Sequence, residues 1–291
     1  ELIGPVGRWQ AAIVVVLMVW LFWHELRRLF YVWTHTGDWS HGLIVPLFSL
    51  YFLHLQRRKL AAIPIRQSFA GLVVLLVALL MYAAAIWPLK MGFPKSVAVV
   101  LAILGVVMML AGVRVLRVAW FAIAYLLFAL PWPVTIYDRS TLPLRKLASE
   151  IAAGILGLCP GIEQATREGT VISYLYHGMP GELGVAQACS GMRLLMAFCA
   201  LGVAMAYLSD RPWWHRAVMV LACLPIAVFC NMVRVTITGL IHIYWSPEYA
   251  QGTAHTLLGL LMLLLAFGLF SGILYVLNNL FVEEEQEAVP T

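Results

Sequence analysis

The sequence predicts an all-α polytopic membrane protein with about eight transmembrane helices. Of its 291 residues, 63% are hydrophobic and only 11% are charged, a balance that soluble domains do not carry. Apolar segments long enough to cross a bilayer recur along the chain. Basic residues gather in alternate loops, as the positive-inside rule requires. We therefore expect a single polytopic membrane domain over residues 1–282 and an acidic disordered tail at 283–291.

The expected spans are apolar stretches separated by polar or charged loops. They cover roughly residues 9–26, 41–55, 68–87, 95–113, 117–135, 190–208, 216–243 and 254–280. The second stretch is short for a span, so its bounds are loose. Tryptophan and tyrosine side chains fall mostly near the span ends, which is typical of an interfacial aromatic belt.

Basic residues orient these spans. The loops after the second, fourth and sixth spans carry Arg57, Arg58, Lys59 and Arg66, then Arg114 and Arg117, then Arg211 and Arg216. Because these loops alternate, they share one side of the membrane, and the positive-inside rule assigns that side to the cytoplasm. Both termini are then cytoplasmic, and the long segment at about 136–188 lies outside.

The outer segment 136–188 has two parts. Residues 143–158, which begin with a proline, are typical of an amphipathic helix at the interface. Residues 170–176 are rich in β-branched and aromatic types, a glycine- and proline-containing turn follows, and 182–187 completes a predicted β-hairpin. An open sheet edge cannot face lipid, so the hairpin must lie outside the hydrocarbon. The end of the hairpin is expected to place Cys189 at the outer end of the sixth span.

Composition argues against several other classes of protein. The net charge of +5 is small and reflects loop charges, so no nucleic-acid partner is expected. The five cysteines form no CxxC motif and no Cys/His pair at metal spacing, which argues against a zinc or redox site. We expect no cofactor and no metal; the lipid bilayer is the one partner that composition implies.

Three reactive side chains are expected at similar depth on the outer face of the membrane. Cys189 begins the sixth span at its outer end. Arg234 lies in the outer half of a span that runs outward, and His255 begins the last span at its outer end. Three separate helices therefore bring a thiol, a guanidinium and an imidazole together, and we expect these residues to be catalytic.

Cys189 differs from the other cysteines in its neighbours. Ser190, Gly191 and Arg193 follow it. Glycine lets another group approach the backbone closely, and amides at a helix N-terminus favour a thiolate. The remaining cysteines lie in apolar surroundings and are expected to act as small hydrophobic residues. They are Cys159, Cys199, Cys223 and Cys230.

Arg234 is the hardest of the three to explain by structure alone, because an arginine inside a span is costly and by default marks function. Asn231 lies one turn before it on the same face and is positioned to orient it. Arg193, one turn after Cys189, is a supporting candidate that holds a neighbouring position or pairs with a carboxylate. Taken alone, His255 fits an interfacial anchor as well as a catalytic group.

Acyl transfer is the chemistry that needs these side chains together. A thiolate attacks a peptide carbonyl to form a thioester, which a second nucleophile resolves. Histidine can take the thiol proton and return it to the leaving amine. Arginine can stabilise the tetrahedral oxyanion or hold the thiolate. The residues leave open which of the two, arginine or histidine, activates the thiol.

At these positions the sequence resembles the exosortase/archaeosortase family of polytopic cysteine transpeptidases. Its Ala-Cys-Ser-Gly box corresponds to residues 188–191, its Asn-x-x-Arg box to 231–234, and its late histidine, typical of the bacterial exosortase branch, to His255. The stretch 40–46, which contains His41, is similar to the family's N-terminal Ser-His-Gly-x-x-x-Pro signature. The resemblance spans about residues 38–260. Gln187 departs from the pattern, since many relatives carry glutamate there.

The resemblance implies a substrate class and a location. Exosortases act on exported proteins that end in a sorting signal, which consists of a Pro-Glu-Pro motif, one transmembrane helix and a short basic tail. Their context is Gram-negative cells that make extracellular polysaccharide. A multi-pass protein of the inner membrane with its active site facing the periplasm is therefore expected. The oligomeric state stays open.

Two other functions remain alternatives. In a transporter or channel, Arg234 and His255 would line a substrate or proton path. In a membrane lipid or acyl transferase, Cys189 would accept a lipid. The nucleophile that resolves the thioester is likewise undetermined between water, an amine and a lipid.

Overall fold

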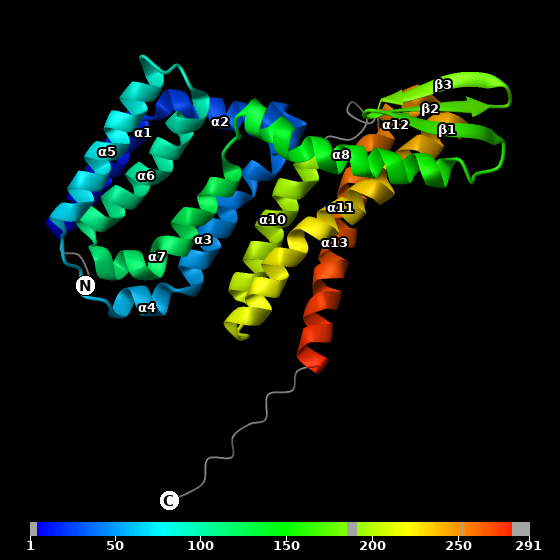
Figure 1. Ribbon diagram of the computed structural model, residues 1–291. Coiled ribbons are helices and arrows are strands. Elements are labelled where there is room, and N and C mark those ends of the chain that lie inside the picture. Colours follow the sequence, from blue (N-terminus) through cyan, green and yellow to red (C-terminus); the bar gives the residue numbers. More distant parts are fainter. Residues whose placement is uncertain (1–4, 185–190, 252, 281–291) are drawn as a thin grey trace, which may run out of the picture. The chain divides into compact units, whose positions relative to one another are not determined.

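The computed structural model describes residues 5–184, 191–251 and 253–280, and the described chain is mostly helical (Figure 1). It divides into two compact units, Glu1–Tyr137 and Asp138–Thr291, which we call unit 1 and unit 2. The expected single domain over residues 1–282 stays a prediction, and the acidic tail at 283–291 lies outside the described residues.

Unit 1 is built from helices of different length. They are α1 (Pro5–Leu21), α2 (Trp23–His35), the 3-10 helix η1 (Gly37–Leu43), α3 (Val45–Leu55), α4 (Arg57–Ala62), α5 (Phe69–Ile86), α6 (Gly92–Leu110), α7 (Val113–Tyr125) and the 3-10 helix η2 (Leu126–Ala129). Gly112 separates α6 from α7: its φ is 90°, and a Cβ there would clash with the carbonyl of Arg66. Only glycine fits such a conformation without strain.

The core of unit 1 consists mainly of apolar side chains. One cluster contains three completely buried side chains: Phe22, which lies between α1 and α2, Ala78 of α5 and Ala102 of α6. A second cluster joins α2, α6 and α7 around Leu29 and Ile123. A cavity of about 520 Å³ lies between α2, α3, α6 and α7.

Unit 2 combines helices with a small sheet. The elements are α8 (Val134–Leu156), which begins in unit 1, β1 (Ile162–Glu168), β2 (Val171–Tyr176), β3 (Met179–Gly184), α10 (Gly191–Leu208), α11 (Trp213–Tyr244), α12 (Pro247–Gln251) and α13 (Thr253–Leu280). The strands form an antiparallel sheet in the order β1-β2-β3. The chain that leads to residue 189 therefore leaves the sheet from an edge strand.

The outer segment differs from expectation in two ways. Strands β2 and β3 form an antiparallel pair, but β3 begins at Met179, inside the expected turn, and not at residue 182. Strand β1 adds a third strand that was missed, because its residues are mainly polar. Helix α8 begins at Val134 rather than near residue 143, so Pro143 lies inside the helix and does not mark its start. Ile162, Ile172 and Leu183 of the sheet pack with α8 and with Val235 of α11.

The helical core of unit 2 lies between α10, α11 and α13. Phe198, Met262 and Phe270 are buried in it together with Cys223 and Cys230. The two cysteines pack among apolar side chains, as small hydrophobic residues do.

Four described helices are long and apolar enough to cross a membrane, judged by length and composition: α5, α6, α11 and residues Leu257–Asn279 of α13. The number becomes five if the bent pair Val113–Ala129 and Val134–Leu156 is one span. Shorter apolar helices cover Ala12–Leu21, Trp39–Leu55 and Leu195–Leu208. Each expected span thus overlaps an apolar helix, but the count of eight stays a prediction.

Candidate active site

Arg234 is fully buried in the middle of α11, with no exposed surface. Its guanidinium reaches the neighbouring helix α13, because a Cβ added to Gly259 would lie 3.9 Å from Arg234 Nη2. A methyl group at this position would be in ordinary van der Waals contact with the guanidinium. The cation lies at the contact between two helices of unit 2 and not on a face exposed to lipid.

His255 lies one helical turn before Gly259, in the first turns of α13. Its side chain lies outside the described residues, as do all side chains at 251–256. The structure nevertheless brings the guanidinium of Arg234 within about one turn of the backbone that carries this histidine. The convergence of the Arg234 and His255 side chains stays a prediction.

The cysteine box lies mostly outside the described residues. Cys189 and Ser190 are not described, and neither is the side chain of Arg193. Gly191 is the first residue of α10, and α10 packs against α11 and α13. Figure 1 shows that α10 and α13 begin, and α11 ends, at the same end of unit 2. Helix α11, which carries Arg234, helix α13, which carries His255, and helix α10 therefore form one bundle.

A polar face runs along α11 around the arginine. Asn231, Arg234, Thr238 and His242 are spaced three or four residues apart and so share one side of the helix. Asn231 and Thr238 are 4% and 1% exposed. Within the described chain, Asn231 Oδ1, Thr238 Oγ1 and His242 Nδ1 are buried without a hydrogen-bond partner. Buried polar atoms are nearly always paired, so such a concentration requires an explanation.

The polar face of α11 ends at the sheet. The ring of His242 lies 6.1 Å from that of Tyr174, almost perpendicular to it, and beside the main chain of Glu182. Burial raises the pKa of Tyr174, which keeps its hydroxyl protonated. At Gly239, a Cβ would lie 3.2 Å from Leu183 Cδ2, so β3 packs closely on α11. The strand that leads to residue 189 is thereby held near the arginine.

Thr238 and His242 were missed by the sequence analysis. Both lie inside the expected span 216–243, at helical spacing from Arg234. Polar residues within a span, repeated on one face, are the signal that would have found them.

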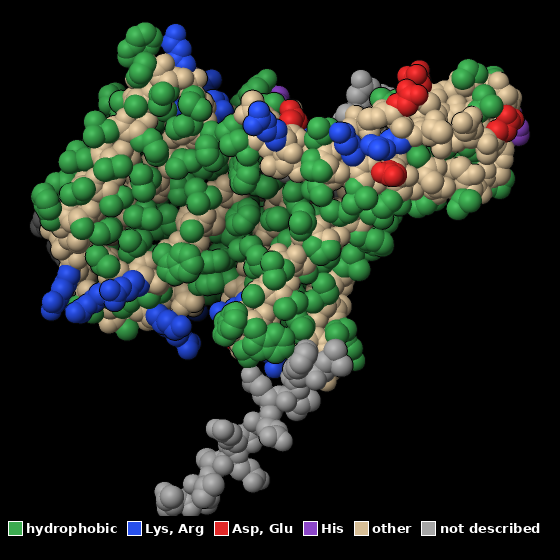
Figure 2. All heavy atoms as spheres, in the orientation of Figure 1, with side chains coloured by type: hydrophobic (Ala, Val, Ile, Leu, Met, Phe, Trp, Pro, Cys, Tyr) green, Lys and Arg blue, Asp and Glu red, His purple; other side chains and the backbone are tan. Residues whose placement is uncertain are grey.

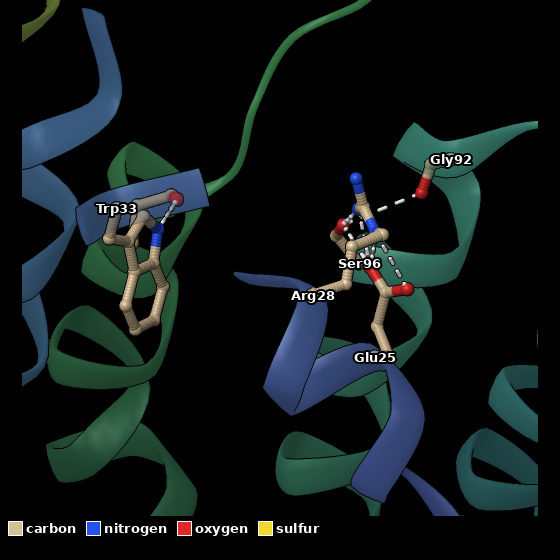
Figure 3. Close-up of polar contacts among 6 residues, drawn as sticks. Glu25, Arg28, Trp33, Gly92 and Ser96 are labelled. Carbon is tan, nitrogen blue, oxygen red and sulfur yellow. Dashed lines mark hydrogen bonds and ion pairs between the residues drawn. The ribbon is translucent and has the colours of Figure 1, made fainter. Parts of the chain in front are cut away.

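His41 has a main-chain contact within unit 1. Its Nε2 donates to the carbonyl oxygen of Phe128 at 3.1 Å. Trp33 Nε1, drawn in Figure 3, donates to the next carbonyl, that of Ala129, at 2.8 Å. The indole of Trp33 covers Gly42, where a Cβ would clash with it. The Ser-His-Gly stretch therefore binds the end of η2. A supporting role of His41 in catalysis stays a prediction.

A second polar cluster of unit 1 was not expected. Glu25 of α2 is 1% exposed and accepts hydrogen bonds from Arg28 Nη2 at 2.6 Å and from Ser96 Oγ at 2.7 Å (Figure 3). Arg28 Nη2 also donates to Ser96 Oγ at 2.8 Å. In the sequence, an acidic residue inside the expected span 9–26 would have indicated this polar cluster.

In the described ranges, no group of three or more His, Cys, Asp or Glu is placed to hold a metal ion.

A family model described as transmembrane exosortase matches residues 33–272. The chain belongs to the transmembrane exosortase family. No curated protein and no solved structure shows significant similarity to it. The match extends over Cys189, Arg234 and His255 and over the Ser-His-Gly stretch near His41. Together with its apolar helices, it makes this exosortase a multi-pass membrane protein.

Proposed function

We propose that this exosortase is a membrane-embedded cysteine transpeptidase or peptidase that cleaves the C-terminal sorting signal of exported proteins. The observation that carries the proposal is the fully buried Arg234, whose guanidinium lies against Gly259, one turn from His255. A buried cation inside a membrane span is costly and marks function. We propose Cys189 as the nucleophile, because residues 188–191 resemble the cysteine box of the family, whose model match includes them.

In the proposed reaction, the Cys189 thiolate attacks the carbonyl carbon of the scissile peptide bond. The carbonyl π electrons move onto oxygen, and the tetrahedral oxyanion then collapses to a thioester with expulsion of the amine. His255 gives the proton that the thiol released to this leaving amine. A second nucleophile, which is water, an amine or a lipid, attacks the thioester and regenerates the thiol.

Arg234 stabilises the charge that this chemistry develops. Burial removes competing water, so the guanidinium acts on the oxyanion or the thiolate in a medium of low dielectric constant. Its position is fixed before the reaction because α11 and α13 pack around it. We propose Asn231 on the same helix face as its support, and Ser190, Gly191 and Arg193 as the support of the cysteine.

The proposed substrate carries a Pro-Glu-Pro motif, one transmembrane helix and a basic tail, and the proposed site faces the periplasm from the inner membrane. The charges of unit 1 support this orientation. Basic side chains of α4 and of the beginning of α7 gather at one end of the unit (Figure 2). A main-chain hydrogen bond from Arg66 to Ala111 joins the two loops there. This end fits the cytoplasmic side.

Mass spectrometry of a co-expressed sorting-signal protein tests the function. With the wild-type exosortase we expect a truncated substrate whose new C-terminal mass identifies the resolving nucleophile. Cys189→Ala should yield only the full-length substrate, whereas Cys199→Ala, which changes a cysteine of α10, should process normally. Equal processing by wild type and Cys189→Ala would rule out the cysteine mechanism. A lipid attached to Cys189 without substrate cleavage would instead favour the acyl transferase.

A further inference from the structure

His242 lies in the last turn of α11, and hydrogen bonding fixes which of its nitrogens carries the proton. The imidazole donates a hydrogen bond to the main-chain carbonyl of Glu182 in β3. The other ring nitrogen, Nδ1, is buried and has no hydrogen-bond partner among the described residues. The bond to Glu182 therefore uses Nε2, which holds the proton of the neutral ring and leaves Nδ1 as an acceptor.

The ring of His242 is held in place by two strands. Besides the bond to β3, it lies 6.1 Å from the ring of Tyr174 in β2, at an interplanar angle of 88°. The Tyr174 ring is fixed in turn, because it covers Gly181 so closely that a Cβ there would clash with it. Glu182 adjoins the imidazole only through its main chain, since its side chain is exposed. The direction in which Nδ1 accepts is thus set by the fold.

Nδ1 belongs to a row of polar groups on α11. Arg234, Thr238 and His242 follow one another at intervals of four residues, so their side chains lie along one side of the helix. Thr238 Oγ1 is likewise buried without a described partner. Buried polar atoms are nearly always paired, so two unpaired ones in line with a buried cation point to a functional role.

The guanidinium of Arg234 extends along this row toward His242. Its Nη2 would lie 3.9 Å from a Cβ on Gly259 of α13. The residue next to this glycine, Leu258, lines the same hollow as Ile241, which directly precedes His242. The cation is thereby brought toward the last turns of α11, where the imidazole lies.

We infer that His242 is the general base of the second half of the proposed reaction, in which a nucleophile resolves the thioester. The inference rests on the proposed function and divides its proton transfers between two histidines. His255 serves the leaving amine, and His242 serves the incoming nucleophile. A ring with one nitrogen fixed by a carbonyl and the other left as an acceptor is what a general base requires.

The step transfers one acyl group and one proton. The nucleophile attacks the carbonyl carbon of the thioester while His242 Nδ1 takes its proton. The carbonyl π electrons move onto oxygen beside Arg234 and then re-form the carbonyl, and the C–S bond breaks with its electron pair on sulfur. The imidazolium of His242 returns the proton to the Cys189 thiolate, which restores the thiol and the neutral ring.

His242→Gln separates proton transfer from anchoring. Glutamine can still donate to the Glu182 carbonyl but cannot take up a proton. After rapid mixing of the purified variant with a sorting-signal protein, the amine fragment should be released in a burst at nearly the wild-type rate. The thioester should then accumulate, because its resolution slows at least about 10²-fold. Intact-mass measurement of the exosortase detects the thioester, and hydroxylamine, a strong nucleophile that needs no base, should restore turnover.

His215→Gln is the matched control, because His215 is another buried histidine of α11, 3% exposed. It should accumulate no thioester. His242→Phe, which keeps a ring against Tyr174 and loses both nitrogens, should accumulate it and serves if the glutamine variant does not fold. Wild-type kinetics in His242→Gln, or equal slowing of fragment release and thioester resolution, would overturn the inference and leave the function standing. If the wild type releases no fragment, or releases it equally after Cys189→Ala, the function fails and the inference with it.

Discussion

The Glu25 cluster of unit 1 and the polar face of α11 in unit 2 differ in how their buried polar groups are paired. In unit 1, the carboxylate of Glu25 is held by Arg28 and Ser96, and the buried hydroxyl of Ser49 donates to the Ala122 carbonyl at 2.7 Å. In unit 2, Asn231 and Thr238 are as deeply buried, yet each has a polar atom without a partner among the described residues. Both groups lie in or beside apolar helices, so solvent exposure does not explain the difference.

The contrast indicates different uses of polarity. A fully paired buried network stabilises one arrangement of helices, whereas an unpaired buried group costs about 1–3 kcal/mol and persists mainly where function requires it. Unit 1 therefore uses its polar groups for structure. Unit 2 holds polar groups ready beside Arg234, on the helix face that we assign to the reaction.

The largest effect on processing is expected from a substitution at Arg234. Arg234→Lys should lower processing about 10²–10³-fold, because lysine keeps the charge but lacks the planar fork that can hold two oxygens. Arg216→Lys is the control, since Arg216 lies on the same helix in an exposed position. Processing of a sorting-signal protein by purified variants is the measurement. Near-normal activity of Arg234→Lys would reduce the arginine to a structural role.

His255→Ala should cost at least about 10²-fold in processing, the lower end for a positioned acid–base group. Adding this change to Cys189→Ala should cost nothing further, because residues that act as one unit are not additive. The Cys189 thiol should also be alkylated more slowly near neutral pH in His255→Ala, since loss of the imidazolium raises the thiol pKa and lowers the thiolate fraction.

The alkylation rate against pH in detergent, with Arg234 intact in both proteins, measures the effect of His255 directly. Superimposable profiles for wild type and His255→Ala would show that the histidine does not activate the thiol. Arg234 would then be the source of thiolate stabilisation.

A stability effect without a catalytic effect is expected in unit 1. Ser96→Ala removes hydrogen bonds to Glu25 and Arg28, and hydrogen bonds to charged groups contribute about 1.5–3 kcal/mol. The thermal midpoint in detergent should fall, while the processing rate per folded molecule stays constant. Ser68→Ala, which removes a serine that caps α5 without a side-chain hydrogen bond, should change neither. Loss of activity at unchanged stability would place Ser96 in the reaction.

The smallest effects are expected from two threonines of α11, one without and one with a described hydrogen-bond partner. Thr238→Val replaces a buried hydroxyl that has no described partner with a methyl group of the same shape. The free energy of unfolding should therefore stay equal or rise by about 1 kcal/mol, while processing should slow. Thr236→Val should lower the free energy of unfolding by about 0.5–1.5 kcal/mol, because the Thr236 hydroxyl donates to the Met232 carbonyl at 2.9 Å. Equal changes in both variants would show that Thr238 only packs.

The sequence predicted most of what depends on local pattern. Helices α5 and α6 follow from uninterrupted apolar runs, and Arg234 was found because a charge inside a span is costly. Strand β1 was missed because its pairing with β2, and not its own composition, makes it a strand. Arg234 and Gly259 lie on two different helices, and no local sequence pattern encodes which residue of α13 would lie beside the arginine.

The cluster around Glu25 also bears on how the protein is made. Arg28 is three residues from Glu25 on the same helix, whereas Ser96 follows 71 residues later. A carboxylate that enters the bilayer alone is strongly disfavoured. Because Arg28 accompanies Glu25, its charge is compensated as soon as α2 has formed. Ser96 then joins the pair when α6 leaves the ribosome, so the order of translation and the order of polar pairing coincide.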